Sequence, residues 1–432
     1  MKMMHSFVSP DYPMFETSVR SFLPQRVTIP FRQADGTEYQ CGCKPGDVVR
    51  EGQVISAPKD ISSSEGAAVH SSVPGKVVSV SRRMLCDGRL GLAAEIATDG
   101  VFSYLGKKIP EADWSFASPL SILEEFRLKG VVNTFGRIPS SLSAQIHERS
   151  LLKNRIVAVR MFDEDPSRYT DSFVAQKRSS DVIQGALIIA KALYAHGIAF
   201  VVPRRSEFSL DGSLFKDLPH CLVQADTSRY PSGFSRNLVR LIASHARTAG
   251  ESVFMHVSQK SLFIDPQTAL SAYEAVVQGI PAVERYVHVT GSCLKSSGMF
   301  KVRIGASIRD LAEQCGGFKT RPSKVIVNGK LTGNAVPGID IPVTKQVKSV
   351  EFVPASQLCS QSEMPCIRCG RCRTVCPEGL APDLLYKCAV RQQCMPRNLC
   401  ATAALCSRCS LCNSVCPSRL PLSQSISLLY KE

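Results

Sequence analysis

The chain has 432 residues, of which 44% are hydrophobic and 21% charged, a composition typical of a globular protein of about three domains. This composition excludes a largely disordered chain. The formal net charge of +15 would attract nucleic acid, an anionic membrane surface or an acidic protein. The longest apolar stretch, 185–203, contains Lys191 and His196, so we expect no membrane span. The first residues lack the apolar core of a secretory signal, and we expect a cytoplasmic protein.

The amino-terminal quarter predicts a small all-β unit. Residues 1–22 are expected to form an irregular lead-in, and from 23 to 117 short β-type runs alternate with Gly and Pro. The segments 46–53 and 73–78 resemble the paired hairpins of lipoyl- and biotinyl-like barrels. A carrier barrel needs a lysine on the tight turn between its hairpins, and the tripeptides typical of that turn are absent. Lys59 remains as a candidate, and we interpret the unit as structural.

Residues 118–281 alternate between helical and strand patterns, which predicts a Rossmann-like α/β domain. Helical periodicity is present at 121–130 and at 181–197, where the final Gly should end the helix. Apolar strand runs occupy 155–162 and 198–203. The same layout continues through 238–250, 252–257 and 266–279.

The carboxy-terminal third predicts two further units. Residues 282–350 are again β-rich, with one helix at 307–316, which indicates a compact α+β domain. From 355 to 432 there are almost no β-branched runs between the cysteines. We expect helices at 382–394 and 422–431 in an α-helical carboxy-terminal domain.

Cysteine spacing gives the sharpest chemical signal. Eleven of the 18 cysteines lie within 366–416, which in a reducing compartment indicates metal ligation. The motif C-x2-C-x2-C-x3-C-P occurs twice in this segment. In such motifs three thiolates wrap one iron–sulfur cube and the fourth reaches the other cube. We therefore predict two [4Fe–4S] clusters, one bound by Cys366, Cys369, Cys372 and Cys416 and the other by Cys406, Cys409, Cys412 and Cys376.

Zinc is the alternative metal for these cysteines. A zinc ribbon needs two C-x2-C pairs, and it does not require a third Cys and a Cys-Pro at identical spacing in two motifs. Iron–sulfur ligation therefore explains more of the pattern. Basic residues inside the loops either offset the negative charge of a cluster or are solvated: Arg368, Arg371, Arg373 and Arg408. Three cysteines between the motifs have no ligand position left, and we interpret them as packing residues: Cys388, Cys394 and Cys400.

The sequence lacks two common nucleotide-binding motifs, and this narrows the functions it can have. Neither G-x-G-x-x-G nor G-x-x-x-x-G-K-[ST] occurs, so the chain has no ordinary Rossmann fingerprint and no P-loop. A zinc- and nucleic-acid-binding protein is a remote alternative suggested by the basic charge. Its Lys and Arg residues are spread over the whole chain, and the aromatic patterns that read RNA are absent, so we predict no nucleic-acid partner.

Taken together, these features resemble the C subunits of the Rnf ion-translocating ferredoxin:NAD oxidoreductase complexes. The likeness is carried by LPQRVTIPF and KPGDVVREGQ in the barrel, by 275–318 and by 364–385. It implies a peripheral subunit on the cytoplasmic face of the inner membrane, with membrane subunits of the same complex as partners. It further implies exchange of electrons with NAD(H) through FMN and transfer through two [4Fe–4S] clusters. The α/β domain would be related to the complex I flavoprotein subunit, and 282–350 would be a soluble-ligand-binding β-grasp domain.

The sequence departs from the family where flavin and nicotinamide would bind. The glycine-rich loop corresponds to 130–140, where Phe135 and Arg137 bring side chains to positions at which glycine permits close backbone approach. The family's ECEP becomes DEDP at 163–166, and its YPQGGEK becomes YPSGFSR at 230–236. FMN and NADH binding therefore stay open. Their candidate residues are Gly136, Asp163, Asp165, Tyr230, Gly233 and Arg236.

Two functions follow from this resemblance. The first is a peripheral electron-transfer subunit of an ion-translocating oxidoreductase, to which we assign no catalytic residue. The alternative, a stand-alone flavin-dependent NADH dehydrogenase, needs the glycines that are missing. Because each cluster with four thiolates contributes −2, the net charge falls from +15 to roughly +11. Such a basic protein can attract an anionic leaflet or an acidic ferredoxin or flavodoxin.

Overall fold

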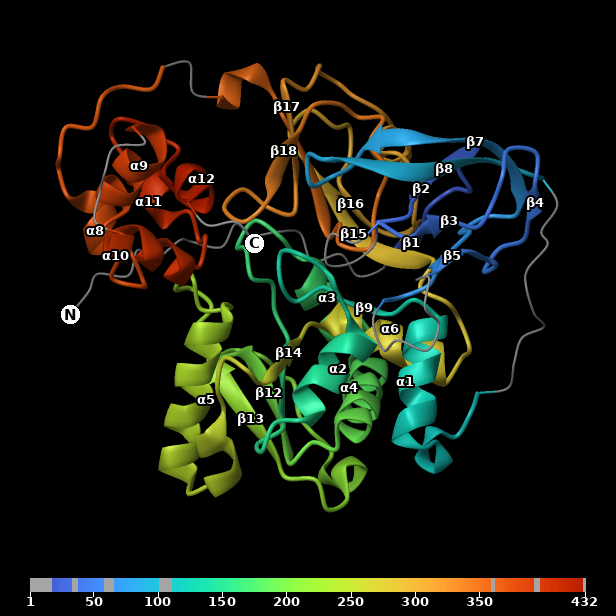
Figure 1. The fold of residues 1–432 in the computed structure, drawn as a ribbon, viewed down its shortest axis with the longest axis horizontal. Helices are drawn as coiled ribbons and strands as arrows, with labels where there is room; N and C mark the ends of the chain where they lie inside the picture. Colours follow the sequence, from blue (N-terminus) through green and yellow to red (C-terminus); the bar gives the residue numbers. More distant parts are fainter. Residues whose placement is uncertain are drawn as a thin grey trace.

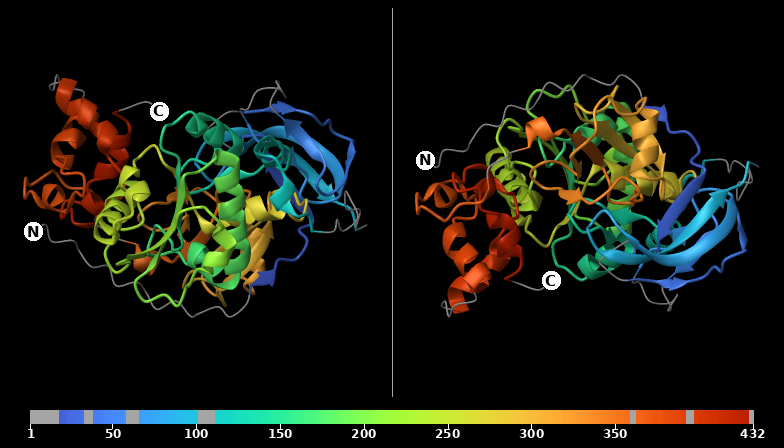
Figure 2. Two further views of the ribbon diagram at one scale, coloured as in Figure 1. Left: turned by 90° about the horizontal axis from the view of Figure 1, so that it is seen from below. Right: turned by 90° about the horizontal axis from the view of Figure 1, so that it is seen from above.

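A computed structural model describes residues 18–32, 38–57, 66–100, 111–358, 362–391 and 397–429. The structure contains four units, one of which is built on a central mixed sheet with the other three around it (Figure 1). A β-barrel lies at one end of the molecule, a small helical unit at the other, and an α/β domain packs below the central sheet. The views from below and above show the helical unit and the barrel at opposite ends (Figure 2).

The amino-terminal unit is all-β, as the sequence predicts. Its two sheets have the orders β2-β8-β7-β4 and β3-β5-β6. Ile29, Phe31 and Ile96 are buried in its core, and β7 and β8 approach so closely that a Cβ at Gly75 would lie 2.0 Å from the Ala97 carbonyl oxygen. Lys59, the candidate carrier lysine, lies outside the described residues. The strands are β2 (Arg26–Pro30), β3 (Gln40–Cys41), β4 (Val48–Val49), β5 (Val54–Ala57), β6 (Val69–His70), β7 (Gly75–Met84) and β8 (Leu90–Thr98).

The α/β domain contains a parallel four-stranded sheet of order β13-β12-β11-β14. Because successive side chains of a strand point to opposite faces, Val157 and Val159 of β11 pack toward α4 and α6, whereas Ile156 and Ala158 pack toward α5. The strands are β11 (Ile156–Arg160), β12 (Gly197–Pro203), β13 (His220–Ala225) and β14 (Leu262–Ile264). The α-helices are α1 (Pro119–Leu128), α2 (Leu142–Ser150), α3 (Thr170–Lys177), α4 (Ser179–Leu193), α5 (Ser235–Ala249) and α6 (Pro266–Val276).

Local details of this domain differ from the sequence prediction. The helix expected to end at Gly197 ends at Leu193, because Tyr194 adopts the left-handed conformation (φ 51°) and caps it. Gly197 instead begins β12, where a Cβ would meet the Phe254 ring at 3.0 Å. Strands β13 and β14 were not predicted. The remaining elements are the short pair β9 (Val132–Asn133) and β10 (Ser140–Ser141), with 3-10 helices η1 (Trp114–Phe116), η2 (Gly212–Phe215) and η3 (Ser252–His256).

The central sheet has the order β1-β16-β15-β19-β17-β18, and the predicted helix α7 belongs to the same unit. Its edge strand β1 (Val19–Arg20) falls within the stretch expected to be irregular and pairs in parallel with β16. A strand of two residues is too short to show the alternation of apolar and polar residues, and its partner is distant in the sequence, so it could not be predicted. The other elements are β15 (Glu284–Thr290), β16 (Gly298–Arg303), α7 (Ile308–Gln314), β17 (Lys324–Val327), β18 (Asn334–Val336), β19 (Ser349–Val353) and η4 (Ala355–Gln357).

The carboxy-terminal unit consists of short helices that connect the cysteine loops. The described part of the helix expected at 382–394 is α9 (Pro382–Arg391), and the helix expected at 422–431 ends earlier, as α12 (Leu422–Ser427). Among all the helices within the described ranges, none is both long and apolar enough to cross a membrane. The other helices of this unit are α8 (Arg371–Val375), α10 (Arg397–Ala401), η5 (Thr402–Leu405) and α11 (Leu411–Ser414).

One buried lysine joins three of these units. Lys345, from the segment before β19, donates hydrogen bonds to the Gly130 carbonyl of the α/β domain at 2.7 Å and to the Ala68 carbonyl of the barrel at 3.3 Å. Neither partner carries a compensating negative charge. Burial therefore lowers the pKa of Lys345 to about 7.

This lysine should make stability depend on pH. Between pH 7 and 10 the unfolded chain keeps a proton on Lys345 that the folded chain has lost, so the free energy of unfolding should rise with pH by up to about 1.4 kcal/mol per unit. Lys345→Met should lack this slope between pH 7.5 and 9 in denaturant titrations. Lys319→Met, at an exposed site, should keep the wild-type slope. Equal slopes in the wild type and Lys345→Met would contradict the assignment.

Candidate cluster-binding site

The two cysteine motifs adopt the same backbone path. Two residues after the first cysteine of each motif, Arg368 and Arg408 have φ values of 56° and 54°. Two residues further on, Gly370 and Ser410 have φ values of 74° and 59° and precede α8 and α11. Non-glycine residues adopt this left-handed region at an energetic cost. Its repetition in both loops shows that the motifs share a folded geometry as well as a spacing.

Four cysteines form an inner group next to the α/β domain: Cys376, Cys406, Cys409 and Cys412. Although Cys376 belongs to the first motif, it is close enough to the other three to affect them electrostatically. Burial raises the pKa of Cys412, and charge on Cys409, Cys406 and Cys376 raises it further. Burial likewise raises the pKa of Cys409 to about 11. A thiol here becomes a thiolate readily only when a cation or metal compensates its charge.

The remaining four motif cysteines form an outer group: Cys366, Cys369, Cys372 and Cys416. Cys366, Cys372 and Cys416 contribute to one apolar cluster with Leu420 and Leu422, to which Cys412 of the inner group also belongs. Burial, Asp383 and Cys416 all raise the pKa of Cys372. Cys369 is exposed, so the outer group lies at the surface whereas most of the inner group is buried.

The donor set of each group is that of a [4Fe–4S] cluster, with three thiols from one loop and one from the other. Backbone N–H groups of the loops also point at sulfur: Leu380 N–H lies 3.4 Å from Cys376 Sγ, and Arg408 N–H lies 3.4 Å from Cys406 Sγ. Such contacts stabilise a thiolate and tune a bound cluster. Within the described part of the chain, no three His, Cys, Asp or Glu side chains are arranged to hold a single metal ion.

The arginines and the remaining cysteines of this unit lie outside the two cysteine groups. Arg373 forms a forked pair with Asp383, with both contacts at 2.7 Å, and thereby joins α8 to α9. The side chains of Arg368 and Arg371 are exposed. Cys388 is buried and hydrogen-bonded with Cys400. Cys394 lies outside the described residues.

Tyr230, a flavin candidate, and Arg137, a departure from the family, both contact the backbone of the inner cysteine loop. The Tyr230 hydroxyl donates to the Cys409 carbonyl at 2.7 Å, and burial followed by proximity to Cys409 raises the pKa of Tyr230. The Arg137 guanidinium donates to the carbonyl of Arg408. Both contacts fix the loop through its backbone, so they do not engage the cysteine side chains.

Two neighbours complete this interface. Arg236 pairs with Glu378, which follows the Cys-Pro of the first motif. Phe234 is buried in an apolar cluster with Tyr230, Cys409 and Leu411. The departures from the family at these positions therefore coincide with contacts between the α/β domain and the cysteine unit.

The two acidic candidates bind backbone groups of the chain itself. Asp163 accepts from the N–H groups of Asp171 and Ser172, at 3.1 and 3.0 Å, in the first turn of α3. Asp165 is fully buried and accepts from the N–H groups of Leu331 and Thr332 at 2.8 and 2.7 Å. It thereby attaches the β17–β18 loop of the central sheet to the α/β domain.

Arg160 packs beside Gly233, one of the two glycine candidates. Its side chain is fully buried, lies 4.4 Å from the Phe135 ring centroid and donates to the Gly233 carbonyl at 3.0 Å. A Cβ at Gly233 would lie 3.2 Å from Arg160 Cδ, whereas Gly136 is exposed. The Phe135 ring also packs on Phe263, with centroids 5.4 Å apart.

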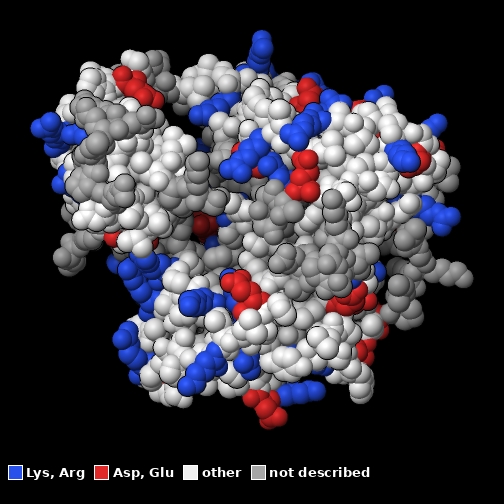
Figure 3. Space-filling view, viewed as in Figure 1, with Lys and Arg blue, Asp and Glu red and all other residues white. Residues whose placement is uncertain are grey.

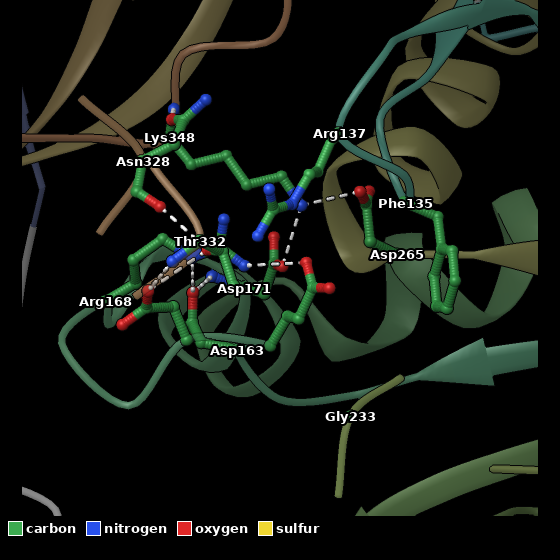
Figure 4. A network of polar contacts seen from close by, with 12 residues as sticks. Phe135, Arg137, Asp163, Arg168, Asp171, Gly233, Asp265, Asn328, Thr332 and Lys348 are labelled. Atoms are coloured by element: carbon green, nitrogen blue, oxygen red, sulfur yellow. Dashed lines mark hydrogen bonds and ion pairs between the residues drawn. The ribbon is translucent and has the colours of Figure 1, made fainter. Parts of the chain in front are cut away.

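A network of buried ion pairs lies next to the packed Arg160 and Phe135 side chains (Figure 4). Lys348 Nζ lies 2.8 Å from Asp171 and 2.6 Å from Asp265, and all three side chains are buried. Burial alone would raise the pKa of Asp265, but Lys348 holds it well below its usual value. Thr134 donates to Asp265 at 2.8 Å, so the network also anchors the 130–140 loop.

Packed in this way, the candidate residues do not fit an FMN. Arg160 and Phe135 pack on each other beside Gly233, one of the flavin candidates, and the carboxylates of Asp163 and Asp165 are already hydrogen-bonded within the chain. Arg160 was not predicted from the sequence, although an arginine inside the apolar run 155–162 was a visible signal. Lys348 was not predicted either, and the local sequence has no comparable signal for it.

Comparison with known proteins bears directly on the resemblance. Residues 16–100 match the RnfC barrel sandwich hybrid domain. The C subunit of an ion-translocating oxidoreductase complex from Rhodobacter capsulatus is 25% identical over 378 residues, covering 83% of this chain and 69% of the relative. The resemblance to the Rnf C subunits is confirmed.

Other C subunits show the same level of similarity. That of Pseudomonas aeruginosa is 27% identical over 87% of this chain, and that of the proton-translocating ferredoxin:NAD+ oxidoreductase complex of Clostridium ljungdahlii is 26% identical over 84%. The alignments cover 49% and 78% of these two relatives. A crystal structure of an NAD+-reducing [NiFe]-hydrogenase aligns with a TM-score of 0.42 and 11% identity, over 66% of this chain and 53% of the hydrogenase chain. That likeness is too slight to support an argument about this Rnf-like chain.

The Tyr230 contact can be tested separately from the cysteines. Tyr230→Phe should leave the buried Cys409 carbonyl without its donor and lower the free energy of unfolding by about 1 kcal/mol. Amide hydrogen exchange in residues 406–412 should become faster. Tyr194→Phe, at a side chain 61% exposed, should change neither quantity. Unchanged exchange in Tyr230→Phe would show that this hydrogen bond does not hold the loop.

Proposed function

We propose that the chain is a peripheral electron-transfer subunit of an Rnf-type ion-translocating oxidoreductase complex, with two [4Fe–4S] clusters. The observation that carries the proposal is the proximity of Cys376 to Cys412 of the second motif and of Cys416 to Cys372 of the first, which supports a crossed arrangement. Exchange of the fourth ligand between two motifs is typical of two-cluster ferredoxins. The relatives, which are named as C subunits of such complexes, support assignment to a complex of this kind.

When bound, each cluster would accept and release single electrons. The chain's own residues then have distinct roles. Tyr230 and Arg137 orient the inner loop through its carbonyls, and Phe234 excludes water from one side of it. The outer group reaches the surface at Cys369. A path from the inner to the outer group would therefore connect the α/β domain with a partner docked at the outside.

Electron input by NADH through FMN is not supported by the site. Arg160 and Phe135 close the position that the flavin would need, and the missing glycines also weaken the case for a stand-alone NADH dehydrogenase. We propose that electrons are exchanged instead with an acidic carrier such as a ferredoxin or flavodoxin. We place the protein on the cytoplasmic face of the inner membrane, held by membrane subunits of the complex.

The charge distribution supports an acidic carrier. Helix α5 carries Arg236, Arg240 and Arg247 and no acidic residue, and it lies beside the cysteine unit (Figure 1). The space-filling view shows Lys and Arg side chains gathered over this side of the α/β domain (Figure 3). A basic surface next to a redox centre accelerates association with an acidic partner.

Selective cysteine substitution tests the crossed ligation. Cys376→Ser should impair the cluster of Cys406, Cys409 and Cys412 and leave the other cluster intact, because only three thiolates of the inner group remain. Cys416→Ser should have the converse effect. Electron paramagnetic resonance of the reduced proteins, together with iron content, distinguishes the two clusters.

The control for these variants is Cys400→Ser, which changes a cysteine of the same unit outside both motifs. It should retain both signals. If Cys376→Ser instead abolishes the cluster of Cys366, Cys369 and Cys372, each motif binds its own cluster and the proposed arrangement is wrong.

Charge reversal tests the carrier. The double variant Arg240→Glu and Arg247→Glu should slow cluster reduction by a reduced ferredoxin or flavodoxin about tenfold at low ionic strength, with the difference shrinking in high salt. Stopped-flow absorbance measures the rate. Arg50→Glu with Arg82→Glu, at exposed sites on the barrel, makes the same change in net charge and should have a much smaller effect. Equal slowing by both pairs would mean that net charge, and not the α5 surface, controls the rate.

A further inference from the structure

A small cavity lies where the central sheet meets the α/β domain, away from the cysteine groups. It has a volume of about 40 Å³, room for roughly three water-sized atoms. Helix α6, strands β15 and β16 and the segment around Val132 contribute to its wall. None of the residues assigned to electron transfer lines it, so it requires a separate explanation.

Buried hydrogen-bond donors line this cavity without partners. Arg285 is 7% exposed, and its Nε and Nη2 atoms have no hydrogen-bond partner among the described residues. Gln267 is equally buried, and its Nε2 also lacks a partner within the described ranges, while its Oε1 accepts from Tyr286 N–H at 3.1 Å. Folded proteins rarely leave such buried donors unsatisfied. Three unsatisfied donor atoms around one cavity, against one unsatisfied acceptor, Glu284 Oε1, therefore indicate a bound acceptor.

The charges around the cavity favour a negatively charged acceptor. Its lining carries two cations, Arg285 and Lys301, two carboxylates, and Lys345, whose pKa is lowered to about 7. Lys301 pairs with both carboxylates, at 2.9 Å from Glu274 and 3.6 Å from Glu284. Arg285 remains without an ion pair among the described residues, and a buried unpaired cation is costly.

Two acids on the far side of Arg285 do not remove this excess. Asp265 and Asp171 influence Arg285 electrostatically, yet burial still lowers the pKa of Arg285 to about 10. Both carboxylates already pair with Lys348 at hydrogen-bond distance. The unpaired Arg285 N–H groups are thus available to a ligand in the cavity.

We propose that this cavity binds a small carboxylate ion, received by the Arg285 guanidinium and the Gln267 amide. A carboxylate matches the fork of an arginine in both shape and charge. Its three core atoms also match the available volume. Because the site joins the central sheet to the α/β domain, binding stabilises the junction of the two units independently of electron transfer.

Thermal unfolding of the full chain, with its clusters intact, tests the proposal. Formate and acetate are the probes, and chloride at equal ionic strength and pH is the reference. The melting temperature should rise with formate or acetate in a saturable manner and should not rise with chloride. Isothermal titration calorimetry should give one site per chain.

Variants connect this effect to the cavity. Gln267→Glu keeps the acceptor for Tyr286 N–H but replaces the free donor by a negative charge, so the apparent dissociation constant should rise at least tenfold. Arg285→Gln should have a similar effect. Lys319→Gln, an exposed site of the same unit, should bind as the wild type does. An equal response to chloride, a response that never saturates, or wild-type affinity in Gln267→Glu would each overturn the proposal.

Discussion

The buried pairing of Lys348 with Asp171 and Asp265 is the interaction on which the rest of the molecule depends. It joins the central sheet to two helices of the α/β domain, and through Thr134 it fixes the loop that the family resemblance associates with flavin. Removing one partner of such a buried pair typically costs about 3–5 kcal/mol, because the other charge is left without compensation. The loop is therefore held in place, and this constrains what the site can bind.

Arg160 extends the same network toward the cysteine unit. It pairs with Asp171 at 3.4 Å and lies against Phe135, so the ion pairs and the closed flavin position belong to one packed region. Next to this region, Tyr230 and Arg137 hold the backbone of the inner cysteine loop. Phe135, Arg137 and Phe234, which depart from the family, thus share a structural role, since each makes packing or hydrogen-bond contacts within the chain.

Part of the fold could be predicted from the sequence, because its signals lie within short stretches of the chain. The apolar run 155–162 predicts the buried strand β11, which the structure contains, whereas the division of eight thiols between two clusters stays a prediction from the cysteine spacing. The alternation of β-type and helical patterns gives the order of the units. Each of these signals lies within a short stretch of chain, where periodicity or spacing can be counted.

The rest depends on contacts between residues far apart in the chain. Lys348 meets Asp171 across 177 positions, and Tyr230 meets Cys409 across 179. No local pattern encodes such pairs, so the hydrogen bonds that Asp163, Asp165 and Tyr230 make within the chain could not be predicted from the sequence. The two-residue strand β1 was missed for the same reason, because its partner is the distant β16.

The central claim is that the chain holds two clusters and that its own side chains close the flavin position. The most direct measurement is the iron, acid-labile sulfide and flavin content of the full chain purified without oxygen. The account predicts about eight iron and eight sulfide per chain, because each [4Fe–4S] cluster holds four of each, together with no stoichiometric flavin. About one FMN per chain, or zinc in place of iron and sulfide, would contradict it.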